Sequence, residues 1–237
     1  MFTAMRAHDH VPDGPCEGPS RRRWLIALCT AGLALVGAVS PLAAQAASVE
    51  DAVAELQHEW EVIKYQTANA EREKRYEALA TKAHQVSETY AGRSEALIWE
   101  GIIMASWAGE KGGLGGLGLA KKAKAMYEAA IRIDGNASDG SAYTRLAVLY
   151  YKVPGWPLGF GDKDKARELL QKGLALNPKG IDPNFFYGEL LSETNHPDEA
   201  MAYLERALQA APRPGRQISD AGRRDEVRAL IAKIKAR

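Results

Sequence analysis

The sequence feature that most constrains the fold is one helical pattern that occurs three times in the second half of the chain. A small residue is followed by a large residue four positions later, a second small residue after seven and a helix breaker after twelve. The copies are Ala123, Tyr127, Ala130 and Gly135; Ala166, Leu170, Gly173 and Pro178; and Ala200, Leu204, Ala207 and Pro212. Such spacing places the first three residues on one helix face, where small side chains let a neighbouring helix approach closely. The repetition predicts stacked helices.

A second helix before each copy makes a helix pair the predicted repeating unit. These preceding helices contain the small residues Gly101, Ala147 and Gly188. Gly188 lies twelve residues before Ala200, whereas the two earlier units have longer separations. The extra residues predict insertions near 107–119 and 153–162. In repeat proteins such insertions collect on one face, which is often the binding face.

The last unit resembles the tetratricopeptide repeat. The residues that carry the resemblance are Asn184, Tyr187, Gly188, Leu191, Ala200, Leu204, Ala207 and Pro212. Ala166 and Ala200 are 34 residues apart, which is the repeat length of that family. Asn184 departs from the pattern, because the family usually has a large aromatic residue there. The resemblance implies an all-α, tetratricopeptide-like solenoid of three to four antiparallel helix pairs, three of them within residues 93–212.

Helical segments flank these pairs on both sides. Residues 47–92 read as an N-terminal helix pair, and residues 216–237 as a C-terminal capping helix. In the capping helix an apolar stripe faces the array: Val227, Leu230, Ile231 and Ile234. Basic residues are expected on its solvent face: Arg223, Arg224, Arg228, Lys233 and Lys235. Asp182, which precedes Pro183, and Asp220 are expected to cap the N-termini of two helices.

Residues 1–46 have the features of a secretory signal peptide. A disordered n-region (1–20) leads to Arg21–Arg23, an apolar h-region (24–40) and the small-residue site Ala44–Ala46. We expect cleavage before Ala47 and a periplasmic protein. The alternative is an uncleaved membrane anchor, although the apolar run is shorter than the roughly twenty residues needed to span a bilayer. Export by the general secretory or the twin-arginine route stays open.

The composition beyond this leader narrows the class of partner. Both cysteines, Cys16 and Cys29, lie in the leader, so the remaining chain has no disulfide and no thiolate. A cysteine-free product suits an oxidising compartment. The remaining chain has 27 basic and 27 acidic residues. This balance gives no reason to expect nucleic acid or an anionic membrane as a partner.

The segment from Tyr150 to Leu174 carries a second resemblance, to the periplasmic T-component of tripartite (TRAP) solute transporters. It rests on Pro154-Gly155, Gly159–Asp162, Lys165-Ala166 and Leu169-Leu170. Phe160 departs from that pattern, since the family tends to have a second glycine there. The resemblance implies a homotrimer with a central pore that works beside an extracytoplasmic solute-binding protein.

No motif indicates catalysis, a cofactor or a metal. Gly113–Gly118 fits the spacing of a dinucleotide-binding loop, but no strand precedes it, so we expect a flexible loop between helices. Beyond the leader only His58, His84 and His196 remain, each without a second histidine at ligand spacing. The sequence therefore favours a non-enzymatic protein, and an enzyme of unknown class is the second alternative.

The expected function is a non-enzymatic scaffold that binds a protein or peptide partner, with a transported solute as an alternative ligand. Repeat geometry assigns the following residues to the inner, partner-binding groove: Ile98, Ile102, Ala105, Thr144, Val148, Tyr151, Phe185, Glu189 and Ser192. The insertion loop adds Trp156 and Phe160. These two side chains either fold back to fill a gap between helices or form a partner surface, since aromatic residues dominate binding hot spots.

Overall fold

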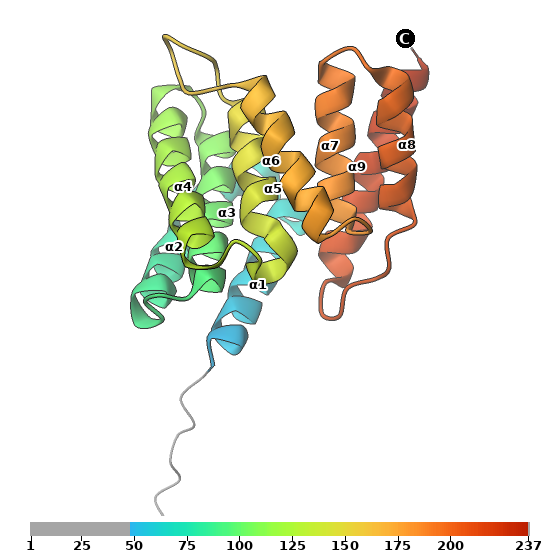
Figure 1. Cartoon of the computed structure of the whole chain (residues 1–237). Coiled ribbons are helices and arrows are strands. Elements are labelled where there is room, and N and C mark those ends of the chain that lie inside the picture. The colour runs from blue at the N-terminus through green and yellow to red at the C-terminus, as the bar shows by residue number, and fades with distance from the viewer. Residues whose placement is uncertain (1–47, 237) are drawn as a thin grey trace, which may run out of the picture. The chain divides into compact units, whose positions relative to one another are not determined.

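The structure, a computed structural model, describes residues 48–236, which form nine α-helices and no β-strand (Figure 1). The helices are α1 (Val49–Gln66), α2 (Asn69–Thr89), α3 (Ser94–Lys111), α4 (Gly113–Asp134), α5 (Ala137–Lys152), α6 (Lys163–Leu176), α7 (Ile181–Glu193), α8 (Pro197–Leu208) and α9 (Gln217–Lys235). The first eight form four consecutive pairs, and α9 packs on the last pair. The predicted all-α solenoid with a capping helix is confirmed. The predicted signal peptide lies outside the described residues.

The repeated pattern forms the contact within each pair. Ala123, Ala166 and Ala200 are fully buried. The small residue of the first helix receives the large residue of the second: a Cβ at Gly101 would lie 2.6 Å from the Tyr127 ring. Because packed interiors leave no room for such an overlap, a small residue is required there.

The first helix of each pair belongs to an inner row that closes on itself. Helices α3, α5, α7 and α9 contact one another in succession, α1 contacts α3, and α1 also contacts α9. The contact between α1 and α9 is close, since a Cβ at Gly222 would lie 2.3 Å from the Tyr65 ring. Glu61 of α1 accepts hydrogen bonds from the backbone N–H and the hydroxyl of Ser219, at 3.1 and 2.6 Å. The first and last described helices thus hold each other.

The glycine-rich segment is not the flexible loop that we expected. Gly112 alone connects α3 to α4, with the left-handed φ of 62° that favours glycine, and Gly113–Gly118 forms the first turns of α4. A Cβ at Gly116 would lie 2.5 Å from the carbonyl oxygen of Ala108. The glycines therefore allow α4 to start in contact with α3, and the extra residues near 107–119 lengthen two helices.

Residues 153–162 do form a loop, between α5 and α6, and backbone hydrogen bonds hold it in one conformation. Gly161 N–H donates to the carbonyl of Pro154 at 2.9 Å, and Asp162 N–H to that of Tyr150 at 2.7 Å. The Asp162 carboxylate then caps α6 through the N–H groups of Asp164 and Lys165. Among the helices of residues 48–236, none combines the length and apolar character that a membrane span requires.

Candidate functional site

The expected inner groove is largely filled by the protein itself. Six of its residues are buried, namely Ile98, Ile102, Thr144, Tyr151, Phe185 and Ser192, while Ala105, Val148 and Glu189 are partly exposed. Helix α1 contacts α3 and α9, and α9 contacts α7, so the inner helices contact one another in a closed ring. The buried six therefore present little surface in this structure, and their contact with a partner stays a prediction.

An aspartate with three arginines lies where α5, α7 and α9 approach one another. Asp182 accepts hydrogen bonds from Arg145 and Arg213 on Oδ2, at 3.1 and 2.9 Å, and from Arg223 on Oδ1, at 2.9 Å. The Arg223 guanidinium also lies 4.5 Å from the ring centre of Phe185. This arrangement pairs charge and covers the apolar faces of the guanidinium groups.

The structure corrects three expectations about these residues. Asp182 does not cap α7, because the N-cap is Gly180 and the Asp182 carboxylate binds arginines. Asp220 does not cap α9 either, because it lies within the first turn and accepts from the N–H and Nε of Arg213, at 2.8 and 2.7 Å. Arg223, expected on the solvent face, is 3 % exposed because Asp182 binds it inside.

The arginines keep Asp182 ionised. Burial alone would raise the pKa of its carboxyl, but Arg145, Arg223 and Arg213 outweigh burial and hold that pKa well below the ordinary 3.8. Burial would likewise lower the pKa of Arg223, yet Asp182 and Glu226 raise it above its usual value. A buried pair of this kind is costly to break, because removing one partner leaves the other charge uncompensated.

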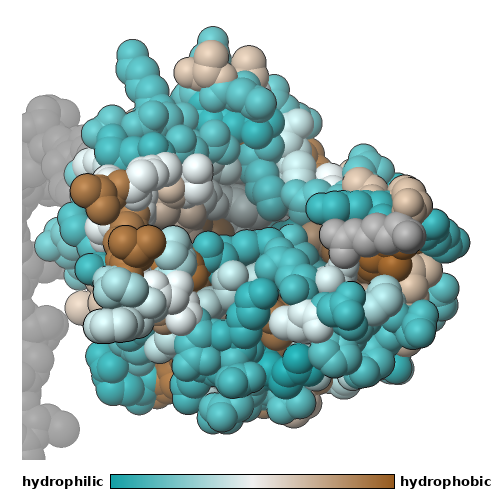
Figure 2. All heavy atoms as spheres, turned by 90° about the horizontal axis from the view of Figure 1, so that it is seen from above, coloured by the Kyte–Doolittle hydropathy of each residue, from teal (hydrophilic) through white to brown (hydrophobic). Residues whose placement is uncertain are grey.

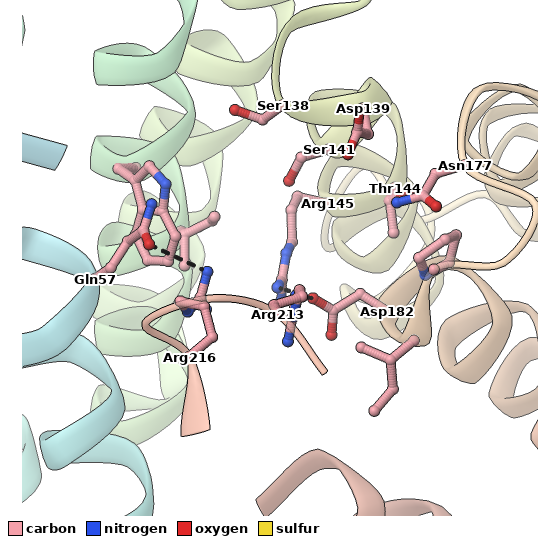
Figure 3. A pocket seen from close by; sticks show the side chains of 15 residues that line it. Gln57, Ser138, Asp139, Ser141, Thr144, Arg145, Asn177, Asp182, Arg213 and Arg216 are labelled. Atoms are coloured by element: carbon pink, nitrogen blue, oxygen red, sulfur yellow. Dashed lines mark hydrogen bonds and ion pairs between the residues drawn. The ribbon is translucent and has the colours of Figure 1, made fainter. Parts of the chain in front are cut away.

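A polar cavity of about 190 Å³ adjoins this cluster, and we call it the arginine cavity (Figure 3). Figure 3 shows Ser138, Ser141 and Arg145 on one side of the space and Gln57 and Arg216 on the other. Its wall consists of Gln57, Trp99, Ile102, Ser138, Asp139, Ser141, Thr144, Arg145, Asn177, Gly180, Ile181, Asp182, Pro183, Arg213 and Arg216. These residues come from α1, α3, α5, α7 and the two connections that precede α7 and α9.

A second hollow, which we call the apolar cleft, lies between the α3–α4 turn and the 153–162 loop. Its volume is about 540 Å³, and it is lined by Ala105, Ala108, Gly109, Gly112, Gly113, Leu114, Gly116, Leu117, Ala120, Leu149, Lys152, Val153, Pro154 and Leu158. Three large apolar side chains on these two segments are exposed: Trp156 by 89 %, Leu114 by 88 % and Leu158 by 73 %. Figure 2 looks onto this end of the helices, where hydrophobic side chains gather at the left of a mostly hydrophilic face.

The two aromatic residues expected in the insertion loop have separate positions. Phe160 folds back onto Tyr150 with ring centres 5.7 Å apart, so it fills the gap between helices. Trp156 extends into solvent instead. Sequence reasoning missed Leu114 and the cavity residue Arg145, although an arginine within the apolar stretch Tyr143–Tyr151 is itself a signal of a buried charge.

The described residues contain no evident catalytic constellation. Within residues 48–236, no three acidic, histidine or cysteine side chains lie close enough together to hold a metal ion. His84 lies 2.9 Å from the buried Glu100, through Nδ1 and Oε1, and the Ser87 hydroxyl donates to Glu100 Oε2 and to the His84 carbonyl rather than to the imidazole. The absence of enzymatic activity stays a prediction.

Comparison with known proteins gives a family match over part of the chain. Residues 158–234 match the family model of the tetratricopeptide repeat. No curated protein matches the sequence. Two crystal structures are similar. TTC0263, a thermophilic TPR protein of Thermus thermophilus, has 15 % identity and a TM-score of 0.44, over 80 % of this chain and 100 % of the other. MamA has 18 % identity and a TM-score of 0.42, and the match covers 70 % of this chain and 91 % of MamA. Proteins with this repeat generally bind protein partners.

Proposed function

We propose that the chain is a non-enzymatic periplasmic scaffold that binds a protein partner in the apolar cleft. The observation that carries this proposal is the exposure of Leu114 and Leu158, which line one hollow, and of Trp156, which lies two residues before Leu158 in the same loop. Large side chains of this kind are rarely left in water as a group, and tryptophan is prominent among the residues that dominate binding energy.

The chemistry of the cleft defines the partner. Among residues 48–236, Lys152 is the only charged residue that lines the cleft, and this lysine is already paired with Glu189 and Glu193, at 2.9 and 2.6 Å. The cleft therefore suits a peptide segment that presents one or two large apolar side chains. Backbone hydrogen bonds fix the 153–162 loop in advance, which lowers the entropic cost of binding.

The test uses a crosslinker and then a measured affinity. A photoreactive amino acid at position 156 should capture the partner in cells, and mass spectrometry should identify it. Isothermal titration calorimetry with the purified partner should then show at least about a tenfold loss of affinity for Trp156→Ala, which corresponds to about 1.4 kcal/mol. Ile133→Ser, which removes an exposed apolar residue far from the cleft in sequence, is the control. Equal affinity of wild type and Trp156→Ala for the partner would rule out the cleft as the binding site.

The periplasmic location rests on the leader, since residues 24–40 and Ala44–Ala46 have the composition of an export signal and its cleavage site. Sequencing the N-terminus of the protein purified from the periplasmic fraction should give Ala47. Retention of residues 1–46 in a membrane fraction would favour the anchor instead.

The alternative function is a T-component-like accessory of solute uptake, favoured by the ordered loop between Tyr150 and Leu174 that carries the resemblance. Light scattering after size exclusion separates the two functions. A trimer would support the accessory, whereas a monomer would leave the general scaffold.

A further inference from the structure

The arginine cavity contains a cation, Arg216, whose ion pair with a carboxylate is long. Asp182 forms ion pairs with Arg145 and Arg223, and Asp220 forms one with Arg213. Arg216 has only Glu61 nearby, with Nε 3.8 Å from Oε2, which is too far for a hydrogen bond. Glu61 in turn is already used by Ser219.

The remaining contacts of Arg216 are few and neutral. Nη1 lies 3.4 Å from Gln57 Oε1, Nη2 lies 3.2 Å from Ser219 Oγ, and Nε is buried with no hydrogen-bond partner. The guanidinium lies 5.1 Å from the ring centre of Trp99. Burial, followed by repulsion from Arg213, lowers the pKa of Arg216 to about 10, so the group stays charged at neutral pH without full compensation.

A second unused donor lies on the opposite wall. Arg145 donates to Asp182 through Nη2, while its Nε is buried without a partner. Both arginines line the same cavity, and Figure 3 shows them on its two sides. Unpaired buried N–H groups are uncommon in proteins, and each such group calls for an explanation.

The wall between the arginines is polar and held in an unusual backbone conformation. Ser138 and Asp139 have φ of 50° and 55°, left-handed values that non-glycine residues seldom adopt in succession. Such residues persist only where the surroundings hold them, and they cluster at ligand sites. The turn places Ser138, Asp139 and Ser141 in the cavity wall.

We propose that the arginine cavity binds a small oxyanion, whose oxygens take hydrogen bonds from Arg216 and Arg145. Its volume of about 190 Å³ holds roughly six waters at about 30 Å³ each, so the ligand has several non-hydrogen atoms and is smaller than a nucleotide or a folded peptide. Guanidinium groups match carboxylate and phosphate in geometry and charge. The ligand class is therefore a small carboxylic acid or inorganic phosphate. This site is separate from the apolar cleft and does not depend on it.

The experiment is isothermal titration calorimetry of the purified chain with sodium phosphate and, in a second arm, with sodium succinate. Sodium chloride keeps the ionic strength constant, so that general screening is excluded. We expect saturable binding of one of the two anions, and the arm that binds identifies the source of the oxyanion. Arg216→Gln should weaken that binding at least about tenfold. The matched control is Arg228→Gln, on the exposed face of α9, which should bind as the wild type does.

A second variant keeps the proposal falsifiable if Arg216→Gln does not fold. Ser141→Leu fills the cavity but retains every arginine. Because Ser141 is partly exposed, the larger side chain should be tolerated, and circular dichroism should show intact helices. This variant should also lose the anion. The proposal is wrong if neither anion binds beyond the chloride control, or if binding is unchanged in both folded variants.

Discussion

The arginine cavity and the apolar cleft lie at opposite ends of the same helix, yet they arise in different ways. The start of α5 contributes Ser141 and Arg145 to the cavity, while its end contributes Leu149 and Lys152 to the cleft. The cleft is made by neighbouring segments of chain, residues 105–120 and 149–158. The cavity joins residues as far apart as Gln57 and Arg216. A hollow made by segments close in the sequence can be predicted from sequence patterns. A hollow that forms only when the array closes cannot.

The two hollows should also differ in what they contribute to stability. The ion pairs beside the cavity stabilise the closed row of helices. The exposed residues of the cleft make few contacts within the fold and should contribute little to its stability. Mutations at the two places should therefore separate stability from binding.

The largest effect is expected at Asp182. Asp182→Ala leaves Arg145, Arg213 and Arg223 without their shared anion, and removing one partner of a buried ion pair costs about 3–5 kcal/mol. Urea denaturation followed by circular dichroism should show this loss. The control Asp225→Ala breaks an exposed pair with Arg228 and should stay within about 0.5 kcal/mol of the wild type. Similar losses for the two variants would contradict a special role of the cluster.

The next effect concerns the helix packing that both hollows share. Ala200 is fully buried, so Ala200→Leu should overpack the contact within the last pair and destabilise the fold by about 1–3 kcal/mol. Ala202→Leu, two residues along and exposed, is the control. An unchanged melting temperature for Ala200→Leu would invalidate the repeat register.

Acid should remove part of the stabilisation by the cluster. The folded-state pKa of Asp182 is depressed, so its contribution is complete above the ordinary pKa of about 4 and is lost as the pH falls through the lower, folded value. In thermal melts, the difference in melting temperature between wild type and Asp182→Asn should be constant from pH 7 to 5 and shrink below pH 4. A difference that grows with acidity would have the wrong sign.

The smallest effect on stability is expected at the cleft. Trp156 and Leu158 are mostly exposed, so Trp156→Ala and Leu158→Ser should each change the free energy of unfolding by less than about 0.5 kcal/mol. Partner affinity should fall in the same proteins. A large loss of stability would mean that these side chains pack against the fold.

Much of the array was predictable because its pattern is periodic. Ala123, Ala166 and Ala200 mark helix faces that pack in the same way, and each is completely buried. The insertion loop was predictable from the change in period, and Trp156 from its aromatic side chain among Pro and Gly. Spacing alone did not distinguish extra helical turns from a loop, which explains the error at Gly113–Gly118.

The filled groove and the cavity were not predictable in this way. Whether the inner row stays open depends on small rotations between successive pairs, which no single repeat encodes. Only after closure do α1 and α9 meet, and only then does Arg223 become buried and Arg216 largely so. In composition and spacing, these two arginines do not differ from the other basic residues among the 31 in the sequence.

The contact between α1 and α9 also affects how the chain reaches its native state. Open repeat arrays fold by adding neighbours, since each unit touches only the next. Here Glu61 accepts hydrogen bonds from Ser219, 158 residues further along the chain. Helix α1 therefore gains all of its contacts only when α9 has docked. Contacts over such separations slow folding. Helix α1, the first of the helices in residues 48–236, is therefore among the last to form all of its contacts, and removal of α9 should loosen both ends of the array together.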